Sequence, residues 1–85
     1  MRLFKWVEWN LQKVAAHALS AAEVEAAFDK VVEIRERRDG SFVMEAVTPA
    51  GLVITVIWRY DRDPDEIPDV FGDLPEDMIF VITAY

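Results

Sequence analysis

The run from Leu52 to Trp58 constrains this chain more than any other feature. Its residues are almost all β-branched or aromatic, and they include no glycine, proline or charge. This composition predicts either a strand that is buried on both faces or a central strand whose outer face is partly wet. The run is too short for a bilayer-spanning helix, which needs about 20 residues. We therefore expect the other segments to pack beside this strand or on top of it.

Length and composition indicate one folded domain over residues 1–85. The chain is 53% hydrophobic, which excludes a disordered polypeptide, and its 85 residues are near the size at which a single core just sustains a fold. The absence of cysteine excludes disulfides, thiolate metal sites and thiol nucleophiles. Residues 1–20 lack the basic start and apolar centre of a signal peptide, so we expect a cytoplasmic protein without a membrane partner.

The negative charge is concentrated in residues 61–78. This segment holds eight acidic residues and a single base, Arg62, so it accounts for the whole net charge of −7. Its prolines and its glycine oppose regular structure, and we expect an acidic loop inserted into an otherwise neutral domain. Such a loop disfavours nonspecific binding to nucleic acid or to an anionic membrane.

The start of this loop has the spacing of a calcium-binding loop, Asp61-x-Asp63-x-Asp65. A calcium loop also needs glycine at its sixth position and glutamate at its twelfth, where this chain has Glu66 and Gly72. The match fails at both positions, so we expect a solvated acidic loop and no metal site. No glycine-rich phosphate loop or nucleophile elbow is present, and no cofactor is expected.

The N-terminal part of the chain predicts a short strand within residues 2–6 and a helix from about Glu8 to Ala18. Polar residues, Asn10 and Lys13 among them, take the side of this helix opposite its apolar stripe. The stripe consists of Leu11, Val14, Ala15 and Ala18. Trp6 and Trp9 bracket the helix start, and we interpret both as core or staple residues rather than as a stacking platform.

A second helix has the clearest local signal. Ser20-Ala21-Ala22-Glu23 is a capping box, in which each polar side chain accepts a hydrogen bond from the other residue's backbone amide. The apolar spacing predicts that this helix ends near residues 29–31.

Beyond the second helix, apolar and polar residues alternate with a period of two, and this pattern predicts strands. Tight turns at 38–41 and 48–51 join three of them, and the last strand follows the acidic loop at 78–84. The expected fold is therefore α+β, with two N-terminal helices packed on an antiparallel sheet of about four strands, in the order β-α-α-β-β-β-β.

Several short pieces, taken in order, resemble one family. The chain opens with Trp6-x-Glu8-x-Asn10 and His17-Ala18-Leu19-Ser20-x-x-Glu23-Val24-Glu25; Phe42, Thr48, Gly51, the strand from Val53 to Trp58 and Val81-Ile82-Thr83-Ala84 follow. This ordered set resembles the BrnT-type toxins, small ribonuclease toxins with a RelE-like fold from bacterial toxin–antitoxin pairs. The resemblance covers nearly the whole chain apart from residues 61–78.

The chain departs from the family pattern where function is expected. Tyr85 stands in place of a closing arginine, and Ser41 in place of the arginine before Phe42. Ala18 replaces a corner glycine, which argues against a left-handed helix cap there. The basic positions around the Thr-x-x-Gly turn are Val47 and Leu52, the basic C-terminal helix is absent, and an acidic loop replaces a short turn.

The family resemblance implies metal-free RNA cleavage, which needs a base, an acid and cations around the phosphorane. The cations that remain are Lys13 and Arg59, and His17, Tyr60 and Tyr85 are candidates for proton transfer. From the residues alone, His17 is more typical of a histidine that binds carbonyls at a helix C-terminus. Since removing one electrostatic contact costs roughly 100-fold to 1000-fold, the loss of several predicts little ribonuclease activity.

Three hypotheses about function follow. The first is a catalytically degenerate BrnT-like protein that acts by binding an antitoxin or another basic protein, binding RNA only weakly if at all. The second is an active metal-independent ribonuclease toxin that inhibits translation. The third is an orphan structural or interaction domain. A homodimer is compatible with each of them.

Overall fold

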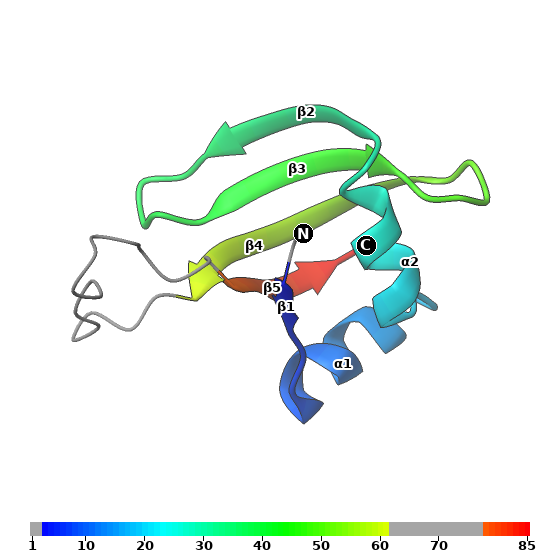
Figure 1. Ribbon diagram of the computed structural model, residues 1–85, viewed down its shortest axis with the longest axis horizontal. Helices are drawn as coiled ribbons and strands as arrows, with labels where there is room; N and C mark the ends of the chain where they lie inside the picture. The colour runs from blue at the N-terminus through cyan, green and yellow to red at the C-terminus, as the bar shows by residue number, and fades with distance from the viewer. Residues whose placement is uncertain (1–2, 62–77) are drawn as a thin grey trace, which may run out of the picture.

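The computed structural model of the protein describes residues 3–61 and 78–85 (Figure 1). Its elements are β1 (Leu3–Lys5), α1 (Glu8–Ala15), α2 (Ala21–Ala27), β2 (Val31–Glu36), β3 (Phe42–Val47), β4 (Val53–Asp61) and β5 (Met78–Ala84). The strands form one sheet in the order β1-β5-β4-β3-β2. Figure 1 shows both helices near the β1 and β5 end of the sheet, with β2 along the opposite edge.

The expected α+β class and the order of elements along the chain are confirmed, but the expected sheet is wrong in two respects. The sheet has five strands, and it is mixed because β1 pairs with β5 in parallel. The physical reason is the position of β5 in the sheet. β4 covers one edge of β5, and the other edge of β5 therefore pairs with the short N-terminal strand β1. The antiparallel meander of β2, β3 and β4 is as predicted.

The core lies between the helices and one face of the sheet. Alternate residues of β4 are buried, namely Ile54, Val56 and Trp58, whereas Val53 is 66% exposed and Thr55 is half-buried. Of the two interpretations of this strand, the partly wet outer face is therefore the correct one. The buried apolar residues are Val14, Leu19, Val24, Ala27, Phe28, Met44, Ala46, Ile54, Val56, Trp58, Ile79, Val81 and Ala84.

The predicted apolar stripe of the first helix is wrong. The residues of α1 that are buried are Asn10 and Val14, whereas Leu11 and Ala15 are exposed. The buried line therefore includes a polar residue that hydrophobic spacing assigned to the solvent side. The helix also ends at Ala15 rather than Ala18, with residues 16–18 in a turn.

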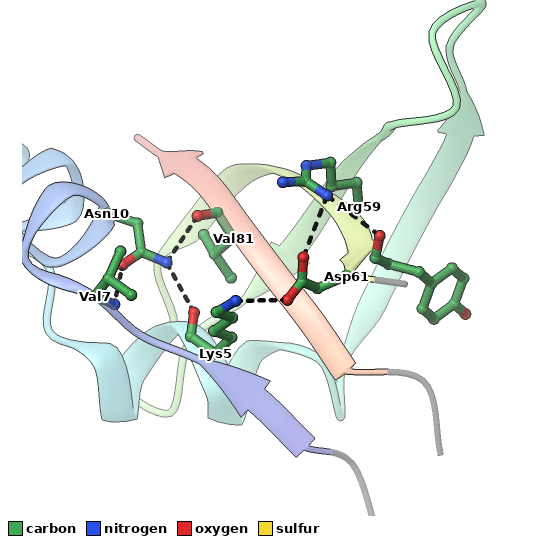
Figure 2. Close-up of polar contacts among 7 residues, drawn as sticks. Lys5, Val7, Asn10, Arg59, Asp61 and Val81 are labelled. Carbon is green, nitrogen blue, oxygen red and sulfur yellow. Dashed lines mark hydrogen bonds and ion pairs between the residues drawn. The ribbon is translucent and has the colours of Figure 1, made fainter. Parts of the chain in front are cut away.

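Asn10 is buried because its amide joins three segments of backbone (Figure 2). Its Oδ1 accepts a hydrogen bond from the Val7 N–H at 2.7 Å, and its Nδ2 donates to the carbonyls of Lys5 and Val81 at 2.9 and 3.0 Å. Lys5 is the last residue of β1, so the strand edge of β5 is uncovered just beyond it. The Asn10 amide satisfies the β5 carbonyl at that point and fixes the start of α1 against the sheet.

α1 ends in a left-handed cap at Ala18, although alanine in place of glycine argues against such a cap. Ala18 has φ 59°, the Leu19 N–H donates to the Val14 carbonyl at 3.0 Å, and the Ala18 N–H donates to the Ala15 carbonyl at 2.9 Å. This is the hydrogen-bond pattern of a Schellman motif, and the buried Val14 and Leu19 supply its apolar contact. The motif therefore forms without glycine.

The second helix ends at Ala27, before the predicted 29–31, whereas its predicted start and the two predicted turns agree with the structure. The capping box of α2 is present, with the Glu23 N–H donating to Ser20 Oγ at 3.2 Å and the Ser20 N–H donating to Glu23 Oε1 at 3.2 Å. The two predicted turns place Gly40 at φ 85° and Gly51 at φ 86°, values that favour glycine.

The predicted acidic loop lies outside the described residues, apart from its first and last positions, Asp61 and Met78. Within the described ranges, no helix combines the length and the apolar character needed to cross a membrane.

Candidate functional site

The sheet has a second face, opposite the helix-packed core, which we call the open face. The residues that alternate with the core positions lie on it; Val43, Val47, Thr55, Ile57, Phe80 and Thr83 are half-buried there. Arg59 pairs with Phe80 across β4 and β5 and is exposed on this face. The candidate site lies where this face meets α1.

Two aromatic rings at this junction stack between two cations. Trp9 of α1 stacks on Phe80 of β5, with ring centroids 6.0 Å apart and an interplanar angle of 12°. Lys13 Nζ lies 5.4 Å from the Trp9 ring centroid, and Arg59 Cζ lies 4.8 Å from the Phe80 ring centroid. These distances are within the range of cation–π attraction, which orders both cationic side chains over the rings.

A second aromatic contact lies just beyond the C-terminal end of α1. The His17 and Tyr85 rings are 5.8 Å apart between centroids and tilted by 51°. The position of Tyr85 is fixed by its backbone, because its N–H and C=O exchange hydrogen bonds with Thr55 at 2.9 and 2.7 Å. His17 follows the end of α1, and among the described residues its hydrogen bond runs from its backbone N–H to the Val14 carbonyl at 3.1 Å.

We name these side chains the open-face row. They are Arg59, Phe80, Trp9, Lys13, His17 and Tyr85. Four of the five sequence candidates, Lys13, His17, Arg59 and Tyr85, are therefore members of one row, although they are far apart in the sequence.

Tyr60 is the candidate that the structure places elsewhere. Its ring packs edge-on against Trp58 and Phe42, with centroid distances of 5.1 and 5.8 Å. Trp58 belongs to the buried core, so Tyr60 lies on the helix side of the sheet. The alternation of β4 requires this, since Arg59 and Tyr60 are consecutive residues that point to opposite faces. Tyr60 and Arg59 cannot serve the same site.

Asp61 connects the row to β1 (Figure 2). Its carboxylate binds Lys5 Nζ at 2.9 Å and Arg59 Nη1 at 3.5 Å. The hydrogen bond from Lys5 is the main cause that holds the pKa of Asp61 below its usual 3.8, and the charges of Lys5 and Arg59 act in the same direction. The carboxylate is thus ionised at neutral pH and compensates part of the charge of Arg59.

The geometry is better suited to binding than to phosphoryl chemistry. In-line RNA cleavage needs cations, base and acid within about 3 Å of one reacting phosphate. Here the two stacked rings lie between Lys13 and Arg59, and Asp61 occupies one side of Arg59. Within the described ranges, no group of three histidine, aspartate or glutamate side chains gathers that could hold a metal ion.

Sequence reasoning missed two members of the row, Trp9 and Phe80. Trp9 is 48% exposed, so the interpretation of this residue as a core residue is wrong. A signal for Trp9 was present, because Trp9 and Lys13 are four residues apart and such spacing places side chains on one side of a helix. Phe80 is recognisable as an open-face residue once its neighbours Ile79 and Val81 are known to be buried.

Comparisons of the chain with known protein families, curated proteins and solved structures find no match.

Proposed function

We propose that this protein is a divergent, RelE-like protein of the BrnT type, from a toxin–antitoxin pair, which acts by binding a partner protein through the open-face row and retains little ribonuclease activity. The observation that carries the proposal is the exposure of large aromatic side chains on one face. Trp9 is 48% exposed and Tyr85 is 54% exposed, and Arg59 lies in the same row.

These three residue types are the ones that dominate the energetics of protein interfaces. Tryptophan, tyrosine and arginine are enriched among hot-spot residues because each buries a large, rigid surface and still has polar or charged atoms to pair. The Trp9–Phe80 stack is held on both sides by cations, so its rings are already ordered before a partner arrives. Preordered side chains reduce the entropy lost on binding.

The charge of the chain favours a basic partner. The net charge is −7, and residues 61–78, with eight acids and the single base Arg62, account for it. A partner with a basic surface would associate faster and be selected over acidic proteins. In a toxin–antitoxin pair, the antitoxin is the protein that would take this role.

The test uses the product of a short basic reading frame beside the gene, with its affinity for the purified protein measured by calorimetry. Trp9→Ala and Tyr85→Ala should each weaken binding by about 30-fold or more, as truncation of hot-spot residues does. Leu11→Ala is the matched control, because Leu11 is an exposed apolar residue of the same helix that lies outside the row. Equal affinity of the wild type and Trp9→Ala would overturn the proposed binding face.

One observation favours a second candidate, the active ribonuclease. His17 and Tyr85 contact each other, so a candidate base and a candidate acid lie near one another. The protein would be incubated with a single-stranded RNA at low salt in the presence of a chelator. Cleavage that is abolished by Arg59→Ala and His17→Ala would establish this candidate and overturn the proposal of lost activity. We expect neither cleavage nor tight RNA binding.

A further inference from the structure

We propose that two copies of this chain associate through β2, pairing their edge strands antiparallel about a two-fold axis at Ile34. β2 is the outermost strand of the sheet, and all six of its residues are exposed. Its apolar side chains are exposed too: Val31, Val32 and Ile34 keep 43%, 64% and 47% of their surface accessible. Edge strands that combine free backbone groups with apolar side chains readily accept another strand.

The hydrogen bonds to β3 show which backbone groups of β2 face outward. The Arg37 N–H donates to the Ser41 carbonyl, so residue 37 faces β3. Because successive residues of an antiparallel strand alternate, Arg35 and Glu33 also face β3, and the N–H and C=O of Ile34 and Glu36 point to the open edge. The backbone N–H and C=O of Ile34 can therefore form hydrogen bonds with a second strand.

The charges of β2 select one register for a pair of identical strands. With Ile34 opposite Ile34 of the second copy, Glu33 lies opposite Arg35 of that copy, and the same ion pair repeats across the axis. Registers move in steps of two residues, since a shift of one residue turns every side chain to the other face. Among the residues of β2 itself, the neighbouring registers place Glu33 opposite a second Glu33, or Arg35 opposite a second Arg35, and both of these pairs on the axis are repulsive.

The monomer itself contains a like-charge pair that this dimer would relieve. Glu33 lies directly opposite Glu45 of β3, and like charges in that position are destabilising. An arginine from a second copy on the other side of Glu33 supplies the missing positive charge. The dimer would extend the sheet across both copies and leave the two open-face rows on the same side, so this proposal is independent of the proposed function.

Charge reversal tests the register, with self-association measured by sedimentation equilibrium up to about 1 mM protein. Glu33→Arg and Arg35→Glu should each weaken the dimer by about tenfold or more, because both cross-axis pairs become repulsive. The double variant Glu33→Arg/Arg35→Glu should restore it. A mixture of the two single variants should form a heterodimer, since every pair between them is again opposite in charge.

The fold is expected to survive these changes. Glu33→Arg replaces the repulsion with Glu45 by attraction, and circular dichroism of each variant checks that the structure is kept. A wild type that stays monomeric over the whole concentration range would overturn the proposal. So would a dimer that is insensitive to both reversals, or a double variant that fails to recover.

Discussion

The two faces of the sheet differ in what holds their side chains in place. On the helix side, Val56 and Val81 are completely buried, and the face is closed by Val14, Val24 and Phe28 from the helical part of the chain. On the open face, the same strands carry half-buried residues, and order there comes from ring stacking and cation–π contacts at α1. The first face is built for stability, whereas the second keeps its apolar and cationic groups accessible.

α1 serves both faces, because it lies against the β5 side of the sheet. Val14 belongs to the core, whereas Trp9 stacks on Phe80 at the open face. Asn10 lies between these two positions and holds the helix to the strand edge. The Asn10 amide therefore holds α1 in the position from which it contacts both faces.

Asn10→Ala should have the largest effect on stability. It removes three hydrogen bonds and leaves two carbonyls and one N–H without their partner, so we expect a loss of about 3 kcal/mol in the free energy of unfolding. Urea denaturation measures it. Gln12→Ala is the control, since the Gln12 amide bonds only the exposed Glu8 carboxylate at 3.1 Å and its removal should cost about 0.5 kcal/mol or less. Similar losses for the two variants would contradict the role assigned to Asn10.

The second prediction compares the faces directly on β4. Val56→Ala should destabilise the protein by about 2–3 kcal/mol, because it removes two buried methyl groups and leaves a cavity. The same substitution at Val53, which is 66% exposed, should cost less than about 1 kcal/mol. Both values come from urea denaturation. If the Val53 variant lost as much as the Val56 variant, the open face would be a buried surface.

Much of the fold was predictable because local signals and periodicity agree. The capping box at Ser20, the turn at Gly40 and the strand from Met78 to Ala84 each depend on residues within a few positions of one another. The parallel pairing of β1 with β5 was not, since it joins strands at opposite ends of the chain and β1 has only three residues. Only packing against the completed sheet fixes such a pair.

Four of the six residues of the open-face row were candidates from the sequence, but Trp9, Phe80 and the contacts between the row's members were not. The resemblance to BrnT-type toxins supplied Lys13, His17, Arg59 and Tyr85, which the fold brings into one row. It also supplied Tyr60, which lies on the other face because successive residues of a strand point to opposite faces. Asn10 was assigned to solvent because hydrophobic spacing treats every polar residue as exposed. The three backbone groups that its amide binds come from β1, β5 and the residue before α1, which lie apart in the sequence or outside the helix.

The third prediction concerns the end of α1. Ala18 occupies the left-handed region, which costs an L-residue about 1–2 kcal/mol, so Ala18→Gly should stabilise the protein by about 1 kcal/mol after the added freedom of the unfolded chain is included. Ala16→Gly is the control, because Ala16 has helical φ and ψ and the substitution there should destabilise by about 0.5–1 kcal/mol. Urea denaturation of both variants measures the difference. Changes of the same sign would contradict the left-handed cap.

The smallest effect is expected at Asp61, where the open face is joined to β1. Because the folded-state pKa of Asp61 lies below 3.8, its interactions stabilise the protein at pH values above about 4, and this contribution is lost as the pH falls through the lower folded-state pKa. Lys5→Gln should raise the pKa of Asp61 toward 3.8 more than Arg59→Gln does, since the Lys5 hydrogen bond is the largest cause of the shift. Carboxyl-carbon NMR over an acid titration measures both.

Asp39 provides the internal reference for this titration. Its pKa is also lowered, but by hydrogen bonds from the Ser41 hydroxyl and backbone N–H at 2.6 and 2.9 Å, and it should not respond to Lys5→Gln. An equal rise in the pKa of Asp39 would mean that the substitution changes the electrostatic field of the whole protein rather than one contact. A larger response to Arg59→Gln than to Lys5→Gln would instead make Asp61 chiefly a partner of the open-face row, with Arg59 more fully neutralised.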